Sequence, residues 1–198
     1  ISDYLIKPVN PNQILLTIKK HLDTARIISE RTTIGYQQAF RNIGMSLHNN
    51  MTFEEWEEVY KKLIYWEIEL ENSSETGLNE ILETQKEEAN NLFGRFVEEN
   101  YRDWMINGED APLMSHNVFK EKVFPEITPN STTFLIMIDN LRLDQWQMLK
   151  PQIEEIFWID QEQTYLSILP TTTQYARNVF FAGLLPTEIQ KLYPDLWL

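Results

Sequence analysis

The sequence predicts an α/β multidomain fragment in which a helical-bundle linker joins two pieces of α/β type. Three observations predict this fold class. A strand-like stretch leads into an amphipathic helix within residues 1–24, and residues 25–127 keep a helical apolar spacing with no β-alternation. Over residues 128–198, strand-like runs alternate with helices, which is typical of a parallel sheet. We therefore expect three domains with these bounds.

Composition excludes several classes of protein. The chain has 17 Lys and Arg against 30 Asp and Glu, a net charge of −13, so its overall field repels nucleic acid polymers and disfavours a conventional DNA-binding domain. It has no cysteine, which excludes disulfides and thiolate metal sites and agrees with a cytoplasmic location. No apolar run is long enough for a membrane span. Because the chain opens on an apolar strand without a start Met, we expect it to begin inside a larger protein.

The first 24 residues read as a strand, a loop and a helix. Tyr4–Leu5–Ile6 are apolar and strand-prone, Asn10 suits a helix N-cap, and Pro11 suits the first helical position. With Lys7 and Pro8 between them, this stretch resembles the last strand, loop and helix of two-component receiver domains. The resemblance implies that Lys7 contacts a phosphorylated aspartate and that the Lys7–Pro8 bond is cis. The alternative is an exposed loop lysine.

The linker is expected to be helical over about residues 26–125. The apolar positions that continue the first helix are Ile27, Ile28, Ile34, Phe40 and Ile43. A second helix begins at a capping box of Thr52 and Glu55, with Met51 and Trp56 placed as a hydrophobic staple. A third helix is expected over about residues 78–106. Most of the excess acid lies on these two helices, as a solvated face or as an acidic docking surface.

The last domain is expected to alternate strands and helices. The order is a buried strand at Thr132–Ile138, a helix at Leu141–Phe157 that Pro151 interrupts, strand-like stretches at Trp158–Ile159 and Tyr165–Leu169, and a helix from about Gln174.

Two polar groups follow the expected strands. Asp139 stands where α/β folds place ligand chemistry, or it caps the helix from Leu141. Thr171, Thr172 and Thr173 are ordinary N-cap residues, or one is a nucleophile that a metal or base activates. A helix starting there would also aim N–H groups at a phosphoryl oxygen. Surface or capping roles are expected for Arg142 and Asp144, and structural or exposed positions for His21, His48 and His116.

The combination of motifs resembles the opening of PglZ domains, which belong to the alkaline-phosphatase superfamily. The stretches are FLIMIDNLRLDQW and SILPTTTQYARNVFFAGLLP. Related nucleotide pyrophosphatases carry Pro-Thr-Lys-Thr, nine residues, then Gly-Leu-Tyr-Pro, and residues 170–173 and 183–186 fall in the same register. The resemblance implies that Thr173 is the nucleophile and that Asp139 and Thr173 bind metal. Thr172 replaces the lysine of that pattern, which leaves the phosphate contact at this position open.

A receiver, a helical linker and a PglZ domain in one chain resemble the PorX-type response regulators of type IX secretion. This resemblance implies two zinc ions, hydrolysis of phosphate esters such as oligonucleotides or cyclic nucleotides, a sensor histidine kinase as partner, and a homodimer on phosphorylation. We expect Asp139 and Thr173 to meet at one sheet edge. The other zinc ligands are expected beyond Leu198, and the phospho-acceptor before Ile1. The alternative is a non-catalytic regulator with a degenerate PglZ binding module.

Overall fold

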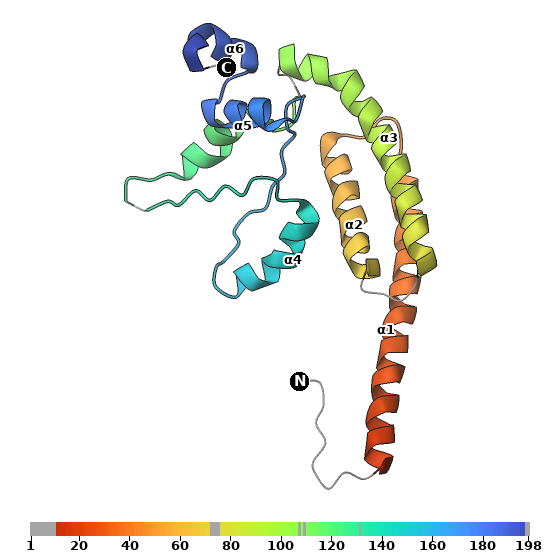
Figure 1. The fold of residues 1–198 in the computed structure, drawn as a ribbon. Coiled ribbons are helices and arrows are strands. Elements are labelled where there is room, and N and C mark those ends of the chain that lie inside the picture. The colour runs from red at the N-terminus through yellow and green to blue at the C-terminus, as the bar shows by residue number, and fades with distance from the viewer. Residues whose placement is uncertain (1–10, 72–75, 107, 109, 131, 197–198) are drawn as a thin grey trace. The chain divides into compact units, whose positions relative to one another are not determined.

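A computed structural model describes residues 11–71, 76–106, 108, 110–130 and 132–196, and the chain divides into two compact units, Ile1–Phe96 and Val97–Leu198. The helices are α1 (Pro11–Ser46), α2 (Phe53–Glu71), α3 (Thr76–Ile106), the π-helix η1 (Phe119–Val123), the 3-10 helix η2 (Phe124–Glu126), α4 (Leu143–Glu154), α5 (Thr173–Ala182), α6 (Pro186–Leu192) and the 3-10 helix η3 (Pro194–Leu196) (Figure 1). The predicted strand at residues 2–6 and the Lys7–Pro8 bond lie outside the described residues.

The first helix begins at Pro11 and continues without interruption to Ser46, as the apolar spacing predicts. Its first half extends beyond α2 and α3 in Figure 1, and apolar side chains such as Leu15 and Leu22 are exposed there. The predicted apolar face was wrong at Ile27, Ile28 and Ile34, which are 45%, 59% and 68% exposed. Ile43 is buried as predicted, and so is Tyr36, which was not among the predicted positions. Two residues turn a helix by about 200°, so Ile34 and Tyr36 lie on opposite faces.

The start of α2 confirms the predicted capping box and staple. The Thr52 N–H donates to Glu55 Oε2 at 2.8 Å, and the Glu55 N–H donates to Thr52 Oγ1 at 3.3 Å. Each bond satisfies a backbone donor that a helix start would otherwise leave without a partner. Met51 and Trp56, which flank this box, are both buried. Local sequence therefore sets the angle at which the chain enters α2.

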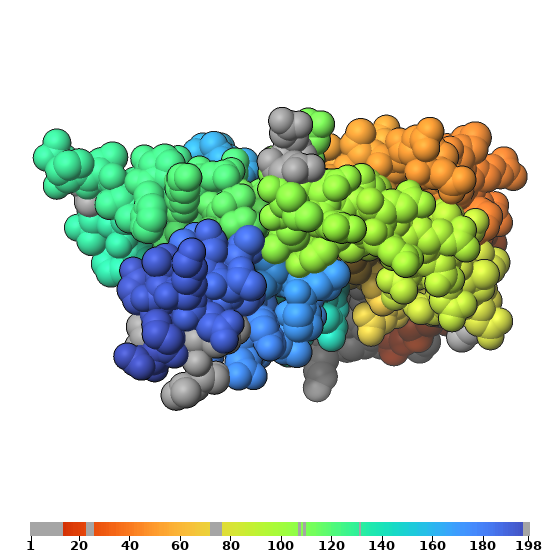
Figure 2. All heavy atoms as spheres, turned by 90° about the horizontal axis from the view of Figure 1, so that it is seen from above, coloured from red at the N-terminus to blue at the C-terminus, as the bar shows by residue number. Residues whose placement is uncertain are grey.

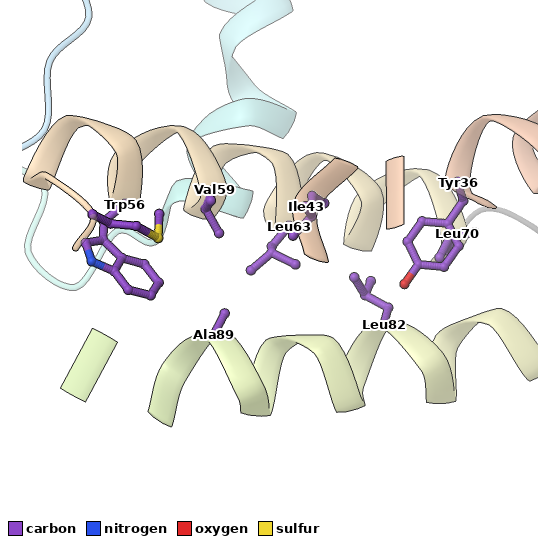
Figure 3. Close-up of a cluster of buried hydrophobic side chains, with 9 residues drawn as sticks. Tyr36, Ile43, Trp56, Val59, Leu63, Leu70, Leu82 and Ala89 are labelled. Carbon is purple, nitrogen blue, oxygen red and sulfur yellow. The ribbon is translucent and has the colours of Figure 1, made fainter. Parts of the chain in front are cut away.

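The second half of α1, α2 and the first part of α3 enclose one hydrophobic core (Figure 3). The buried members are Tyr36, Ile43, Met51, Trp56, Val59, Leu63, Leu70, Leu82 and Ala89. The Trp56 ring packs on Phe93 and Phe96 of α3, with ring centroids 5.5 and 6.1 Å apart. In Figure 2 the atoms of α3 border on those of the segment around the α1–α2 connection. Burying each large side chain contributes about 1.5–3 kcal/mol, so packing holds the bundle together.

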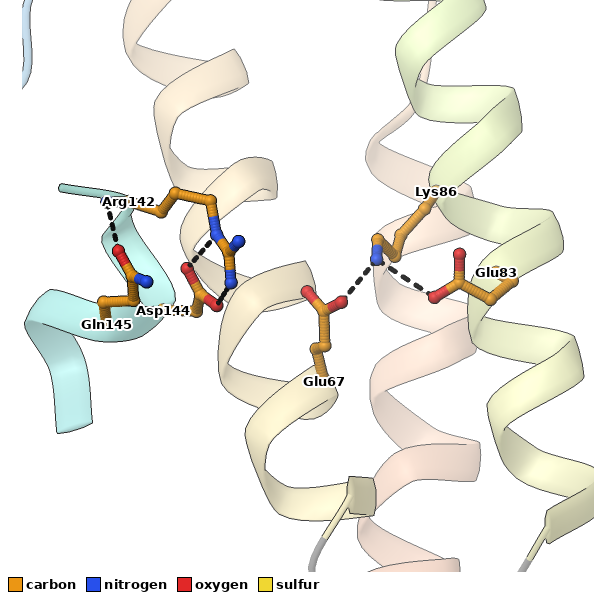
Figure 4. A network of polar contacts seen from close by, with 6 residues as sticks. All are labelled: Glu67, Glu83, Lys86, Arg142, Asp144 and Gln145. Atoms are coloured by element: carbon orange, nitrogen blue, oxygen red, sulfur yellow. Dashed lines mark hydrogen bonds and ion pairs between the residues drawn. The ribbon is translucent and has the colours of Figure 1, made fainter. Parts of the chain in front are cut away.

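Polar contacts also join α2 and α3. Lys86 Nζ of α3 lies 2.6 Å from Glu67 Oε1 of α2 and 3.0 Å from Glu83 Oε1 (Figure 4). Burial is the largest single effect and lowers the pKa of Lys86, but the hydrogen bonds to Glu67 and Glu83 and the charges of these carboxylates together raise it above its ordinary value. The side chain of Gln85, which is buried, donates from Nε2 to the carbonyl of Phe40 at 3.0 Å and so ties α3 to α1.

The second unit contains α4, α5 and α6 and one short β contact. Met114 and Leu166 form a parallel bridge, in which the Leu166 N–H donates to the Leu113 carbonyl at 2.8 Å and the Ser115 N–H donates to the Leu166 carbonyl at 3.1 Å. This bridge falls within the predicted strand-like stretch at residues 165–169. The sequence did not indicate its partner, which lies about fifty positions earlier in the chain.

The predicted strands at 132–138 and 158–159 are not formed among the described residues. Residues 132–138 run as an extended chain with exposed side chains, including Phe134 at 83% and Ile136 at 81%, and Figure 1 shows no arrow there. A strand exists only where a neighbouring strand accepts and donates its hydrogen bonds, and no described segment pairs with this one. The predicted parallel sheet is therefore not confirmed.

The predicted interruption at Pro151 was wrong, because α4 continues through Pro151 to Glu154. Glu162, on the chain that follows α4, accepts hydrogen bonds from side chains of this helix. Its carboxylate accepts from Trp146 Nε1 at 2.9 Å and from Lys150 Nζ at 3.0 Å. Proline removes one backbone hydrogen bond of the helix. The two hydrogen bonds to Glu162 come from Trp146 and Lys150, in the turn and a half before Pro151, and they offset that loss.

None of the helices in the described part combines the length and hydrophobicity needed to cross a bilayer.

Candidate functional site

Asp139 ends the extended segment in a turn with Asn140, whose φ is 60°. Since α4 begins only at Leu143, Asp139 does not cap this helix, and that alternative for its role is excluded. Its side chain is exposed. Burial, first, and the negative charge of Asp139, second, raise the pKa of the Tyr165 hydroxyl. The carboxylate of Asp139 is therefore open to solvent.

The start of α4 uses the residues that the sequence predicts to be surface or capping groups. The Arg142 N–H donates to Gln145 Oε1 at 3.1 Å, and Arg142 Nε donates to Asp144 Oδ1 at 2.9 Å (Figure 4). The hydrogen bond from Arg142 is the main cause that lowers the pKa of Asp144 to about 2. Arg142 and Asp144 therefore pair with each other at the helix start.

The threonines of the PTTT motif lie where the chain enters α5. Thr172 is in the N-cap position, and its carbonyl accepts from the N–H groups of Tyr175 and Ala176 at 3.0 and 2.9 Å. Thr173 is the first residue of α5 and is exposed, within one position of the predicted start. The helix is followed by its C-cap Gly183, whose φ of 62° suits glycine. The Gly183 N–H donates to the Val179 carbonyl at 3.0 Å.

Two hydrogen bonds from outside the motif hold the chain that leads into it. The buried Ile168 N–H donates to Ser115 Oγ at 3.0 Å, and the Leu169 N–H donates to the Tyr101 hydroxyl at 2.7 Å. Both acceptors lie more than fifty positions upstream. Sequence reasoning missed Ser115 and Tyr101, because neither belongs to a motif and only the tertiary structure brings them to this segment.

Asp139 and Thr173 offer oxygen ligands of the kind that zinc accepts. Among the described residues, no three His, Cys, Asp or Glu side chains gather into a metal-binding group. The residues described here therefore do not by themselves form a zinc site. Lys7 lies outside the described residues, and the meeting of Asp139 and Thr173 at one sheet edge stays a prediction. His48 accepts the Asn50 N–H at 3.3 Å, His21 is exposed, and His116 is half-buried.

Comparison with known families covers most of the described chain. Residues 26–105 match the family described as the PorX response regulator linker domain. Residues 118–198 match the family described as the BREX system PglZ alkaline phosphatase-like domain. These are the domains of a PorX-type regulator with a PglZ domain. No curated protein matches the chain.

The two matches correspond to different parts of the structure. The PorX linker match covers most of α1, all of α2 and nearly all of α3, whose helices enclose the core around Trp56 and Leu63. The PglZ match includes Asp139, Thr173 and the helices α4 to α6. A response-regulator linker therefore precedes an alkaline phosphatase-like domain in this chain, which associates it with two-component signalling.

Proposed function

We propose that this chain belongs to a two-component response regulator whose effector is a zinc-dependent phosphodiesterase. The observation that carries the proposal is the position of Thr173. This residue is exposed at the first position of α5, inside the segment that matches an alkaline phosphatase-like domain. The resemblance of the PTTT motif to that of nucleotide pyrophosphatases implies that Thr173 is the nucleophile. A hydroxyl at a helix start lies beside backbone N–H groups that favour the charge of a phosphoryl group.

The proposed step is a displacement at phosphorus. The Thr173 hydroxyl gives its proton to water, its oxygen forms a bond to phosphorus as the bond to the leaving alcohol breaks, and the leaving oxygen takes up a proton from water. Water then attacks the phosphorus of the covalent Thr173 intermediate, which still carries the second alcohol. This releases a phosphate monoester, and the Thr173 oxygen takes back a proton. Zinc, when bound, would lower the pKa of the hydroxyl and offset charge on the phosphoryl oxygens. Asp139 would serve as one of its ligands, as a charged oxygen donor that solvent reaches.

The regulatory part of the proposal rests on the linker match. A sensor histidine kinase would phosphorylate a receiver domain, and Lys7 would contact that phosphoryl group. Phosphorylation would favour a homodimer, and the regulated process would be type IX secretion, controlled from the cytoplasm. Oligonucleotides or cyclic nucleotides are the proposed substrates, since the resemblance to nucleotide pyrophosphatases runs through the motif around Thr173.

The decisive experiment compares Thr173→Ala with Thr171→Ala in the full-length protein, using bis(p-nitrophenyl) phosphate as substrate. Thr171 is exposed in the same motif, two positions before the proposed nucleophile, and therefore serves as the matched control. We expect Thr173→Ala to abolish hydrolysis while bound zinc falls only in part, and Thr171→Ala to retain activity. Full activity in the Thr173→Ala protein would remove the proposed role of Thr173.

A second pair of variants tests the metal. Asp139→Asn is compared with Asp160→Asn, which removes the same charge at another exposed position of the same unit. We expect Asp139→Asn to lower both zinc content and hydrolysis, because it removes a charged ligand, and Asp160→Asn to change neither. A wild-type protein that binds the diester and zinc but never hydrolyses the diester would favour the non-catalytic binding module instead.

A further inference from the structure

Three exposed residues of different chemistry follow one another along α5. Thr173, Arg177 and Phe181 are spaced four residues apart and all three are exposed, whereas Val179 on the opposite side is fully buried. Residues at this spacing share one face of a helix, and each step advances about 6 Å along the axis. We call these three residues the α5 stripe. It places a hydroxyl, a guanidinium and an aromatic ring in line.

The guanidinium of Arg177 is available to an anion. Among the described residues no carboxylate forms an ion pair with it, although the chain carries a net charge of −13. Its planar group offers paired N–H donors that match two oxygens of a phosphoryl group. One turn separates it from Thr173. A phosphoryl group at the start of α5 would therefore lie within reach of the long Arg177 side chain.

The ring of Phe181 is exposed and yet fixed in place. It is 54% exposed, and its centroid lies 5.6 Å from that of Phe119 and 5.8 Å from that of Phe180. Contacts on two sides hold the ring, so little conformational freedom is lost when a planar group stacks on its open face. An exposed aromatic ring beside a cation is the combination that binds nucleotides in sequence-tolerant sites.

We propose that the α5 stripe binds the substrate, with Arg177 on the non-bridging phosphoryl oxygens and Phe181 stacked on a nucleobase of the phosphodiester. This inference rests on the proposed function, in which Thr173 attacks the same phosphorus. It adds two substrate-binding residues, to which the sequence analysis assigns no role. It also predicts a preference for nucleoside esters over esters that lack a planar group. Phe181 would set this preference, and Arg177 would bind both kinds of ester.

The test measures binding in the full-length, zinc-loaded Thr173→Ala protein by calorimetry, with thymidine 5′-monophosphate and methyl phosphate as probes. Arg177→Gln should lower the affinity for both probes by roughly ten- to a hundredfold, because a charged hydrogen-bonding partner is lost. Lys191→Gln is the matched control, since it removes the same charge from an exposed position on α6, and it should change binding of neither probe. Equal affinities in Arg177→Gln and Lys191→Gln would overturn the role of Arg177.

The aromatic end of the stripe has its own pair of variants. Phe181→Leu should lower the affinity for thymidine 5′-monophosphate by about tenfold. The affinity for methyl phosphate should not change, because that probe has no base to stack on the ring. Phe124→Leu, at an equally exposed ring that packs on Phe119, should leave both affinities unchanged. If Phe181→Leu lowers the affinity for both probes, or for neither, stacking on Phe181 is contradicted.

The failure of the two proposals can be told apart. If Thr173→Ala retains hydrolysis, the proposed function fails, whatever the stripe binds. If Thr173→Ala is inactive while Arg177→Gln and Phe181→Leu bind thymidine 5′-monophosphate as tightly as their controls, the stripe alone fails. Thermal melting of each variant checks that the fold is retained, which is expected because both side chains are exposed.

Discussion

The indole ring of Trp66 on α2 closes over Gly35 of α1, where a β-carbon would lie only 3.0 Å from the Trp66 Cη2 atom. The ring cannot move aside easily, because Tyr36 and Tyr65 pack against it with centroids 5.5 and 5.1 Å away. The Gly35→Ala variant should therefore lower the free energy of unfolding by about 1 kcal/mol, although alanine favours a helix by a similar amount. Urea unfolding measures the change.

Gly44 on the same helix provides the matched control. Apart from its chain neighbours and the backbone of its own helix, nothing lies within 4 Å of a β-carbon added there, so Gly44→Ala should raise the free energy of unfolding by about 0.5–1 kcal/mol. Opposite signs for the two alanine variants are the expected result. If Gly35→Ala stabilises the protein as much as Gly44→Ala does, the Trp66 ring leaves room for a β-carbon at position 35, and the proposed close contact is contradicted.

The Tyr36 hydroxyl is buried and has no hydrogen-bond partner among the described residues. Burial also raises the pKa of this hydroxyl to about 12. The Tyr36→Phe variant keeps the ring and its contact with Trp66 but removes the isolated polar atom, so we expect it to stabilise the bundle by about 1 kcal/mol. Tyr36→Ala should instead lower the free energy of unfolding by about 3–5 kcal/mol, because it leaves a cavity. A destabilised Tyr36→Phe protein would show that the hydroxyl has a partner.

Ser115 supports the chain that leads into the PTTT motif. Its hydroxyl, which is almost fully buried, accepts the buried Ile168 N–H at 3.0 Å. The Ser115→Ala variant should lower the free energy of unfolding by about 1–3 kcal/mol, because it leaves that N–H without an acceptor. Ser167→Ala is the control, since Ser167 makes only a long 3.4 Å contact, and it should cost far less. Equal losses in both variants would argue against a special role for Ser115.

His116 should make stability depend on pH. Burial is the main cause that lowers its pKa, against the weaker raising effect of Glu188 on α6 and Glu121 on η1, and Nδ1 has no partner among the described residues. As pH falls below the unfolded value near 6.5, the unfolded chain takes up a proton before the folded one does. The free energy of unfolding should therefore fall from about pH 6.5 down to the lowered pKa of the folded state.

Urea unfolding at several pH values between neutral and mildly acidic measures this slope. The His116→Gln variant cannot take up the proton, so its free energy of unfolding should depend less on pH over the same interval than that of the wild-type protein. A slope in the His116→Gln variant equal to that of the wild-type protein would assign the pH dependence to other groups.

The sequence by itself determined the features that depend on neighbouring residues. The capping box of Thr52 and Glu55 follows from side chains within one helical turn, and α1 and α5 begin at or within one position of the predicted residue. The sequence predicts the last of these helices from about Gln174, one position after the observed start at Thr173. Such signals can be recognised before the fold is known, because their hydrogen bonds span only a few positions.

Only the tertiary structure decided which distant groups meet. It pairs Leu166 with Met114, joins Ser115 to Ile168, and places Trp66 over Gly35, none of which any local pattern indicates. It also leaves residues 132–138 extended and exposed, although their composition is that of a buried strand. Composition expresses a preference for a pleated, buried environment, whereas a strand forms only when another segment supplies the hydrogen bonds and covers its faces.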